Sequence, residues 1–282
     1  MPIQPLHTRT KKWLTALIGA SMVFTAVSPV LHPIEHVSAK SVQKKAKKKQ
    51  YLTPYSKKGI VHLTVPKLKS GQSAYVVLAK GKKDYSFKVR KSQNIPLPFG
   101  NGVYSVTLYS GNGKSYKEME SKTVRTSFST LTASKQRTIL SPGNSDKEVQ
   151  KLMKTKFKDW KKWSQSKRVA NVHAYVTKTY SYDYDLLDNL PEWFLPDMNR
   201  IAKKKKGICY DMASITSSLL REMNVPTRIV MGYPTTVDGY HSWNEVYINK
   251  KWRTIDTTTD LKTKVKSPYK STKAYKKVTY RF

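Results

Sequence analysis

The sequence predicts an α+β protein in which a small all-β, sandwich-like domain precedes a mixed domain built around one buried helix. Short stretches that alternate apolar and polar residues, separated by Gly and Asn turns, fill residues 51–127. Apolar residues at helical spacing follow from residue 145, and strand-like stretches come after them. The 282 residues are enough for one or two domains.

The first 39 residues have the layout of a secretory signal peptide. A basic start at residues 9–12 precedes an apolar run over residues 13–30, and residues 37–39 form a small-residue cleavage site. An uncleaved membrane anchor is the alternative, but the apolar run is short for a span of ~20 residues. We therefore expect a secreted protein, with the lysine-dominated residues 40–50 as a basic linker.

The charge balance says more about partners than about fold. The chain carries 53 Lys and Arg residues against 18 Asp and Glu residues, a net charge of +35. Such a chain is attracted to nucleic acid, anionic lipid and phosphate-rich wall polymers. A secreted protein meets little nucleic acid, so we expect an anionic cell-wall polymer or cell surface as partner. We expect no specific nucleic acid and no stable membrane span after signal cleavage.

Within residues 51–127, alternation predicts strands near 59–65, 75–78, 85–89 and 103–109. Their short, even spacing indicates a small sandwich that serves as a spacer or binding module. Residues 128–144 are rich in Ser and Thr and end in Pro-Gly, which is typical of a linker. Residues 145–282 are then predicted to form the second domain.

Two helices are expected at the start of that domain. Ser145 and Glu148 have capping-box spacing, and an apolar stripe follows them. A second helix is expected over residues 167–180, with His173 packed or exposed rather than catalytic, because no partner lies near it in sequence. Residues 182–198, rich in Asp, Pro and aromatics, are interpreted as a long loop; their acids lack the spacing of a calcium-binding loop.

The one cysteine of the chain, Cys209, lies where the best helix begins. Apolar residues recur after it at spacings of three and four, which buries one face of the helix. The free N–H groups and the dipole at a helix start stabilise a thiolate and can help to hold an oxyanion. A single cysteine forms no internal disulfide, and with no Cys/His cluster we expect no metal. The stripe comprises Ile208, Met212, Ile215, Leu219 and Met223.

A hairpin predicted after this helix aligns a histidine with a carboxylate. Strands are expected over residues 228–233, 241–248 and 251–257, with a two-residue turn at 249–250. In this register His241 lies opposite Thr258 and Asp256 is its diagonal neighbour, at ~7–8 Å between Cα atoms. The carboxylate would orient the imidazole, and the imidazole would deprotonate Cys209.

Four blocks, residues 207–213, 225–228, 240–246 and 252–258, resemble the core of the bacterial transglutaminase-like family, part of the papain-like cysteine acyltransferase and protease superfamily. The resemblance covers roughly residues 165–260. It implies a papain-like α+β fold with the catalytic helix packed on an antiparallel sheet. It further implies Cys209 as nucleophile, His241 as base and Asp256 as orienting acid, with supporting roles for Asp211, Trp243 and Asn244.

The resemblance leaves the side-chain oxyanion donor open, with Trp193 and Tyr180 as candidates. The expected function is that of an exported cysteine enzyme, without a cofactor, that forms a thioester on Cys209 from a carboxamide or peptide. The acyl group then passes to an amine or to water. The alternative is a non-catalytic, cationic cell-wall-binding or adhesive protein; nucleic-acid binding rests on charge alone. Residues 261–282, which interleave Lys and Tyr, are expected to form an exposed cationic tail or a final strand.

Overall fold

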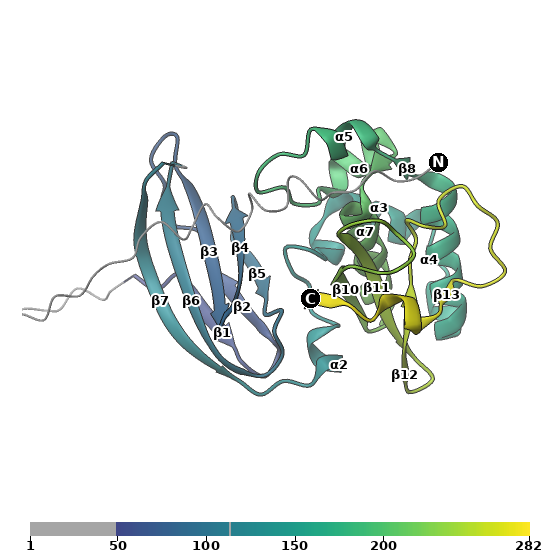
Figure 1. Ribbon diagram of the computed structural model, residues 1–282, viewed down its shortest axis with the longest axis horizontal. Helices are drawn as coiled ribbons and strands as arrows, with labels where there is room; N and C mark the ends of the chain where they lie inside the picture. The colour runs from purple at the N-terminus through teal and green to yellow at the C-terminus, as the bar shows by residue number, and fades with distance from the viewer. Residues whose placement is uncertain (1–48, 113) are drawn as a thin grey trace, which may run out of the picture.

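The computed structural model describes residues 49–112 and 114–282, and its two main parts lie side by side (Figure 1). The expected signal peptide, residues 1–39, lies outside the described residues, as does most of the expected basic linker. Within the described residues, no helix has both the length and the apolar character needed to cross a membrane. The fold is α+β, with a sheet-rich N-terminal region as predicted.

The N-terminal part is a sandwich of two antiparallel sheets. One sheet has the order β1-β2-β5, from Leu52–Tyr55, Ile60–Leu63 and Gln93–Pro96. The other has the order β4-β3-β6-β7, from Lys83–Val89, Ser73–Lys80, Gly102–Gly111 and Tyr116–Thr126. Large apolar side chains fill the space between the sheets, among them Leu52, Leu63, Leu78, Phe87, Ile95 and Leu108.

Three of these strands, β1, β5 and β7, were not predicted. All three lie at sheet edges, where one side of the backbone is unpaired and the apolar signal is weak. β1 and β5 each contain a proline, which an edge strand tolerates. β7 is largely polar and is held mainly by its long pairing with β6.

The segment from 128 to 144 connects the two parts and is itself packed. It contains α2 (Thr130–Ala133) and leads into the 3-10 turn η2 (Gly143–Ser145). Ser134, Thr138 and Ser141 in this segment are buried. The Ser141 hydroxyl meets that of Ser217 on the central helix, so the connector forms part of the wall around that helix.

The first predicted helix forms, but its cap is different. α3 spans Lys147–Thr155, and Asp146 is the N-cap: its carboxylate accepts from the N–H groups of Glu148 at 2.9 Å and Val149 at 3.3 Å. Ser145 belongs to η2 instead, so the expected Ser145 capping box is wrong. α4 spans Gln165–Thr179 and buries the face predicted for it, His173 included.

The segment expected to be a long loop contains helical turns. α5 spans Tyr184–Asp188 within it, and α6 spans Met198–Lys204 and begins at its last residue. Their N-caps are Asp183, which accepts from the Leu186 N–H at 3.1 Å, and Asp197, which accepts from the Arg200 N–H at 3.0 Å. Acidic residues that were interpreted as loop features are therefore capping residues.

A five-stranded antiparallel sheet with the order β13-β12-β11-β10-β14 supports the central helix, α7 (Cys209–Glu222). Asn244 pairs with Ile255, which is the register predicted for the hairpin. Asn249 and Lys250 both have positive φ, at 50° and 58°, as a tight two-residue turn requires. The strands are β10 Thr227–Gly232, β11 His241–Ile248, β12 Lys251–Ile255, β13 Tyr269–Lys270 and β14 Val278–Arg281.

Helix α7 is buried on all sides. The predicted stripe from Ile208 to Met223 is buried, and its members from Met212 onward pack into the helical core. The opposite face carries Ser214, Ser217 and Ser218, which are also buried. Because every face of this helix contacts protein, its first turn is held rigidly at the point where Cys209 lies.

The two parts share a core at their junction. Phe282, which lies between them in Figure 1, packs its ring at 4.9 Å from that of Tyr85 and at 6.3 Å from that of Phe87, both on β4. The hydroxyls of Tyr85 and Tyr210 lie 3.5 Å apart. Since Tyr210 directly follows Cys209, the sandwich contacts helix α7 at the residue next to that cysteine.

Candidate active site

The structure places Cys209 as the first residue of α7, with Ile208 as N-cap. The Asp211 carboxylate accepts from the Ile208 N–H at 3.0 Å and thereby fixes the helix start. A side chain at Gly207 would press against Asp211 and Met212, so glycine allows the close approach before the cysteine. The Cys209 side chain is largely buried, with the residue 7% exposed.

Asp211 has a second partner, the Arg200 guanidinium from α6. Burial raises the pKa of Asp211 to about 6, although Arg200 and the Ile208 N–H act in the opposite direction. The sequence-predicted supporting role of Asp211 thus corresponds to a helix-capping carboxylate whose charge is compensated by α6.

His241 and Asp256 meet across the hairpin as their register predicts. His241 Nε2 lies 2.9 Å from Asp256 Oδ2. Asp256 is fully buried, and its Oδ1 accepts from the N–H groups of Thr258 at 3.0 Å and Thr259 at 3.2 Å. The carboxylate is therefore fixed from both oxygens.

The imidazole also reaches the cysteine. Because Nε2 is engaged by Asp256, Nδ1 is the ring atom left to hydrogen-bond the Cys209 side chain. Burial by itself would lower the pKa of His241, but the Asp256 carboxylate and the Cys209 sulfur outweigh it and raise the pKa to about 10. Burial alone would raise the pKa of Asp256, but the neighbouring His241 and the hydrogen bonds to the carboxylate lower it by more. The pKa therefore lies below the ordinary value of an aspartate, and the carboxyl stays ionised. This arrangement favours the imidazolium form of His241, held between the Asp256 carboxylate and the Cys209 sulfur.

Tyr182 lies against Cys209, and the sequence did not single it out. Its two-residue strand β8 (Ser181–Tyr182) pairs in parallel with β9 (Lys206–Gly207), with Tyr182 opposite Gly207. The Cys209 N–H donates to the Tyr182 hydroxyl, which also hydrogen-bonds the Cys209 side chain. Burial raises the pKa of Tyr182 far above its ordinary value, with the Cys209 sulfur adding to the shift, so the phenol stays neutral and can donate.

No local pattern could have identified Tyr182, because its position depends on parallel pairing with a segment that follows it by 25 residues. The two residues considered as oxyanion donors lie elsewhere. Trp193 packs on Tyr75 of the sandwich, with ring centroids 5.2 Å apart. Tyr180 is buried in the helical core and contacts Tyr175.

Trp243 and Asn244 surround the site from β11. The Trp243 ring stacks on His241, with centroids 6.3 Å apart and planes at 17°. The Asn244 amide donates to the Ala213 carbonyl at 3.0 Å and the Arg228 carbonyl at 3.1 Å, which ties α7 to the sheet. Both predicted supporting residues therefore contact the elements that carry Cys209 and His241.

Tyr275 is a second residue that the sequence did not reveal. It lies in the 3-10 helix η4 (Thr272–Tyr275), in the segment expected to be a tail or strand. Its hydroxyl donates to Asp256 Oδ2 at 2.9 Å, the same oxygen that His241 contacts, and its ring packs edge-on against Trp243 at 5.2 Å. A lysine- and tyrosine-rich segment thus contacts the carboxylate that orients His241.

His173 belongs to a separate cluster. Its Nε2 lies 2.9 Å from Asp260 Oδ2, and Lys270 pairs with the other oxygen of Asp260. The expectation that His173 is packed rather than catalytic fits this arrangement, and its partner was missed because it follows 87 residues later. The cluster joins α4 to the segment after β12.

The model of the transglutaminase-like superfamily matches residues 154–257, which include Cys209, His241 and Asp256. No curated protein matches the chain. Similar solved structures include a transglutaminase, with 22% identity, coverage of 46% of this chain and 36% of that chain, and a TM-score of 0.34.

LapG of Legionella pneumophila is 16% identical, over 51% of this chain and 81% of that chain, with a TM-score of 0.37. A candidate cysteine protease from Cytophaga hutchinsonii is 15% identical, over 76% of this chain and 70% of that chain, with a TM-score of 0.39. On the match to the superfamily model, residues 154–257 form a transglutaminase-like domain.

Proposed function

We propose that the protein is an exported cysteine enzyme that forms a thioester acyl-enzyme on Cys209. The acyl donor is a carboxamide or a peptide, and the acyl group passes to an amine or to water. The observation that supports this most directly is the chain of contacts from Asp256 through His241 to the Cys209 side chain. Members of the superfamily are typically cysteine enzymes, which agrees with this chemistry.

In the acylation step, the Cys209 sulfur attacks the carbonyl carbon of the donor and a tetrahedral intermediate forms. The carbon–nitrogen bond then breaks, and His241 transfers its proton to the departing nitrogen, which leaves as ammonia or an amine. The products of this step are the thioester and a neutral imidazole. Asp256 keeps the imidazole oriented throughout.

In the second step, neutral His241 takes a proton from the incoming amine or water while that molecule attacks the thioester carbonyl. The carbon–sulfur bond breaks, which releases an amide or a carboxylic acid and restores the thiolate and imidazolium. In both steps the oxyanion would be stabilised by the Cys209 N–H and the Tyr182 hydroxyl, which hydrogen-bond each other beside the sulfur in the free protein. We assign the oxyanion to this pair.

Export is the part of the proposal that rests on sequence alone, through the signal-peptide layout of residues 1–39. The division into a sandwich at 51–127 and a catalytic unit at 145–282 likewise stays a proposal. An extracellular, wall-associated enzyme would meet peptides and amines of the cell surface as donors and acceptors. An anionic wall polymer would attract its positive charge.

The test is incorporation of a biotin-tagged primary amine into a glutamine-containing peptide, followed by mass spectrometry of both peptide and protein. The wild-type chain should label or hydrolyse the peptide and should carry a thioester adduct on Cys209. Cys209→Ala should remove both products, whereas Ser214→Ala, on the same helix, should retain them if it folds. Product formation by Cys209→Ala at the wild-type rate would overturn the proposal.

A further inference from the structure

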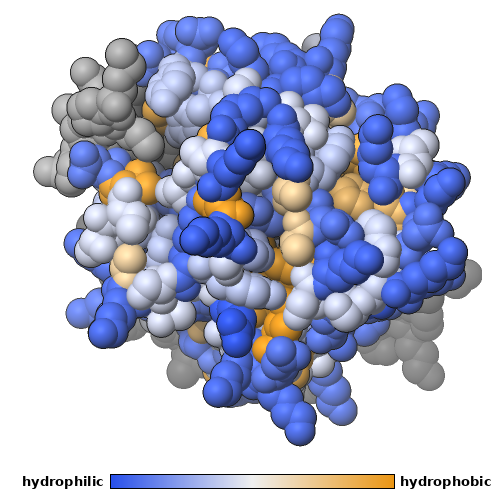
Figure 2. Space-filling view, turned by 90° about the vertical axis from the view of Figure 1, so that its right-hand side faces the viewer, coloured by the Kyte–Doolittle hydropathy of each residue, from blue (hydrophilic) through white to orange (hydrophobic). Residues whose placement is uncertain are grey.

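Lysine and arginine residues are numerous along the whole chain, so charge alone does not distinguish one binding site from another. A selective site also needs a cavity whose shape and lining fit the ligand. Figure 2 shows the face of the mixed domain that lies on the right in Figure 1, and hydrophilic side chains cover most of it. Residues 147–168 are denser in charge than the chain as a whole, with nine Lys and Arg residues against two acidic residues. This stretch also lines a cavity of about 360 Å³.

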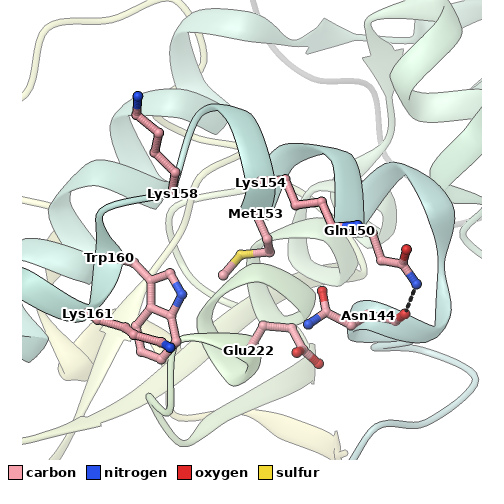
Figure 3. Close-up of a pocket in the computed structure, with 8 residues that line it drawn as sticks. All are labelled: Asn144, Gln150, Met153, Lys154, Lys158, Trp160, Lys161 and Glu222. Carbon is pink, nitrogen blue, oxygen red and sulfur yellow. Dashed lines mark hydrogen bonds between the residues drawn. The ribbon is translucent and has the colours of Figure 1, made fainter.

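The cavity combines cations, amides and one indole ring. Lys154 lies in the last turn of α3, Lys158 in the turn that follows and Lys161 in η3 (Trp160–Lys162). In Figure 3, Trp160 and Lys161 lie on one side of the cavity and Gln150 and Asn144 on the other. Met153 and Glu222 lie between them, so the cavity has an apolar patch beside its charged rim.

The three lysines are not neutralised within the protein. Among residues 49–112 and 114–282, none of them forms an ion pair. The one acid of the lining, Glu222, is already held by Arg137, whose Nε lies 2.5 Å from Oε1 and whose Nη2 lies 2.9 Å from Oε2. The cavity therefore offers three lysines to a ligand, of which Lys158 is also attracted to Asp159, an acid that pairs with Lys162.

The wall beside Asn144 is built for close contact. Gly143 has a φ of 56°, and a side chain there would collide with the Glu222 carboxylate. The Gln150 amide donates to the Asn144 carbonyl at 2.6 Å, which holds the turn against α3. The side-chain oxygen of Asn144 is buried and has no hydrogen-bond partner among the described residues. Amide groups beside cations suit a ligand that has hydroxyls as well as negative charges.

We propose that this cavity is a binding site for an anionic polymer that carries both phosphates and hydroxyls, such as a polyol phosphate or sugar phosphate chain. The lysines would contact the phosphates, and Trp160 and the amides would contact the backbone of the polymer. A single-stranded nucleic acid is the less suitable occupant, because the lining has one aromatic ring rather than a series of stacking platforms.

The site lies apart from the thiol. Glu222 is the last residue of α7 and Cys209 is the first, so the two are roughly 20 Å apart along the helix. A polymer bound here leaves the surroundings of Cys209 free. The site would tether the enzyme to an anionic matrix whether or not the proposed acyl transfer occurs.

The experiment measures binding of the full chain to a synthetic glycerol phosphate oligomer across a range of salt concentrations. A variant with Lys154→Gln, Lys158→Gln and Lys161→Gln should bind about tenfold more weakly. The slope of log affinity against log salt concentration should become shallower by about two units in this variant, because each lost phosphate contact reduces the slope by ~0.7. The matched control replaces Lys67, Lys69 and Lys82, three exposed lysines of the sandwich, with Gln and should retain the wild-type affinity within about twofold.

Equal weakening in both triple variants would mean that overall charge alone drives binding, and would overturn the proposal. A single-stranded oligonucleotide of the same charge is the second probe. If it binds the cavity more tightly than the glycerol phosphate oligomer, the site is one for nucleic acid and the proposed ligand is wrong. Cys209→Ala should bind like the wild type, which separates this result from the fate of the acyl-transfer proposal.

Discussion

At the scale of single residues, Asp256 controls the electrostatics of the site. It is buried, accepts hydrogen bonds at both oxygens and lies 2.9 Å from the His241 ring. His241 would be hard to protonate at a buried position without it, because burial favours the neutral ring. The proposed chemistry needs a protonated ring to release the leaving group, so its pH dependence reports on this contact.

We predict that the pH profile of kcat/KM falls on its alkaline side near pH 10, rather than near the ordinary histidine pKa of 6.5. Because the folded pKa of His241 exceeds the unfolded one, the ion pair stabilises the protein fully below pH 6.5 and is lost as the pH rises to about 10. In Asp256→Asn this alkaline fall should move to lower pH, since burial then acts without a carboxylate to offset it. An unchanged alkaline fall in that variant would remove Asp256 from this role.

Tyr182 is the second residue whose contribution can be measured separately. Its neutral phenol hydrogen-bonds Cys209 at both the backbone and the sulfur. Removing an oxyanion donor lowers kcat by about 100-fold, and we predict this for Tyr182→Phe, with a small change in KM. The control is Tyr184→Phe, because Tyr184 is exposed and its ring neighbours that of Tyr182. Full activity of Tyr182→Phe in a steady-state assay would show that the backbone N–H suffices.

At the scale of elements, the proposed triad and Tyr275 come from three segments. α7 supplies Cys209, the β11–β12 hairpin supplies His241 and Asp256, and η4 adds Tyr275. The third segment lies beyond residues 154–257, which match the superfamily. The segment after β12 is thus part of the structure around the site and not only a charged tail.

Tyr275→Phe should lower the free energy of unfolding by about 1.5–3 kcal/mol, because the hydroxyl donates to a buried, ionised carboxylate. Urea denaturation at neutral pH measures the loss. Tyr247→Phe is the matched control, since no hydrogen bond of its hydroxyl occurs among the described residues, and it should stay within about 0.5 kcal/mol of the wild type. Equal stability of the two variants would contradict the importance of the Tyr275 contact.

At the scale of the whole molecule, the sandwich and the mixed part share one apolar core. Phe87 of the sandwich, and Ala213 and Phe282 of the mixed part, belong to the same cluster of buried residues. Tyr85 stands at the centre of this junction, where its ring meets those of Tyr280 and Phe282. Burial raises the pKa of Tyr85 to about 12, and its hydroxyl contacts that of Tyr210.

We predict that the described parts unfold in a single calorimetric transition, because neither can separate without exposing this shared surface. Tyr85→Ala should lower the free energy of unfolding by about 3 kcal/mol, as expected for removal of a packed aromatic ring. The same variant should also slow acyl transfer, because Tyr85 contacts Tyr210, the residue that follows Cys209. Two separate transitions in the wild type would show that the junction is weak.

Local patterns predicted much of the mixed part. The stripe of α7, the turn at 249–250 and the register between β11 and β12 all follow from spacing along the chain. The contact of His241 with Asp256 was therefore predictable, because a hairpin register fixes which side chains are neighbours. The edge strands β1, β5 and β7, the Asp146 cap and helices α5 and α6 were missed, since their signals are short or polar.

The sequence by itself determined the fold class and placed Cys209 at a helix start and His241 beside Asp256, because each depends on neighbours within about 20 residues along the chain. Tertiary structure alone decided which residues complete the surroundings. Tyr182 reaches Cys209 through a parallel pair, Tyr275 reaches Asp256 from η4, and Tyr85 reaches Tyr210 from the sandwich. Such contacts join distant segments, and their geometry comes from how whole elements pack rather than from any periodicity in the chain.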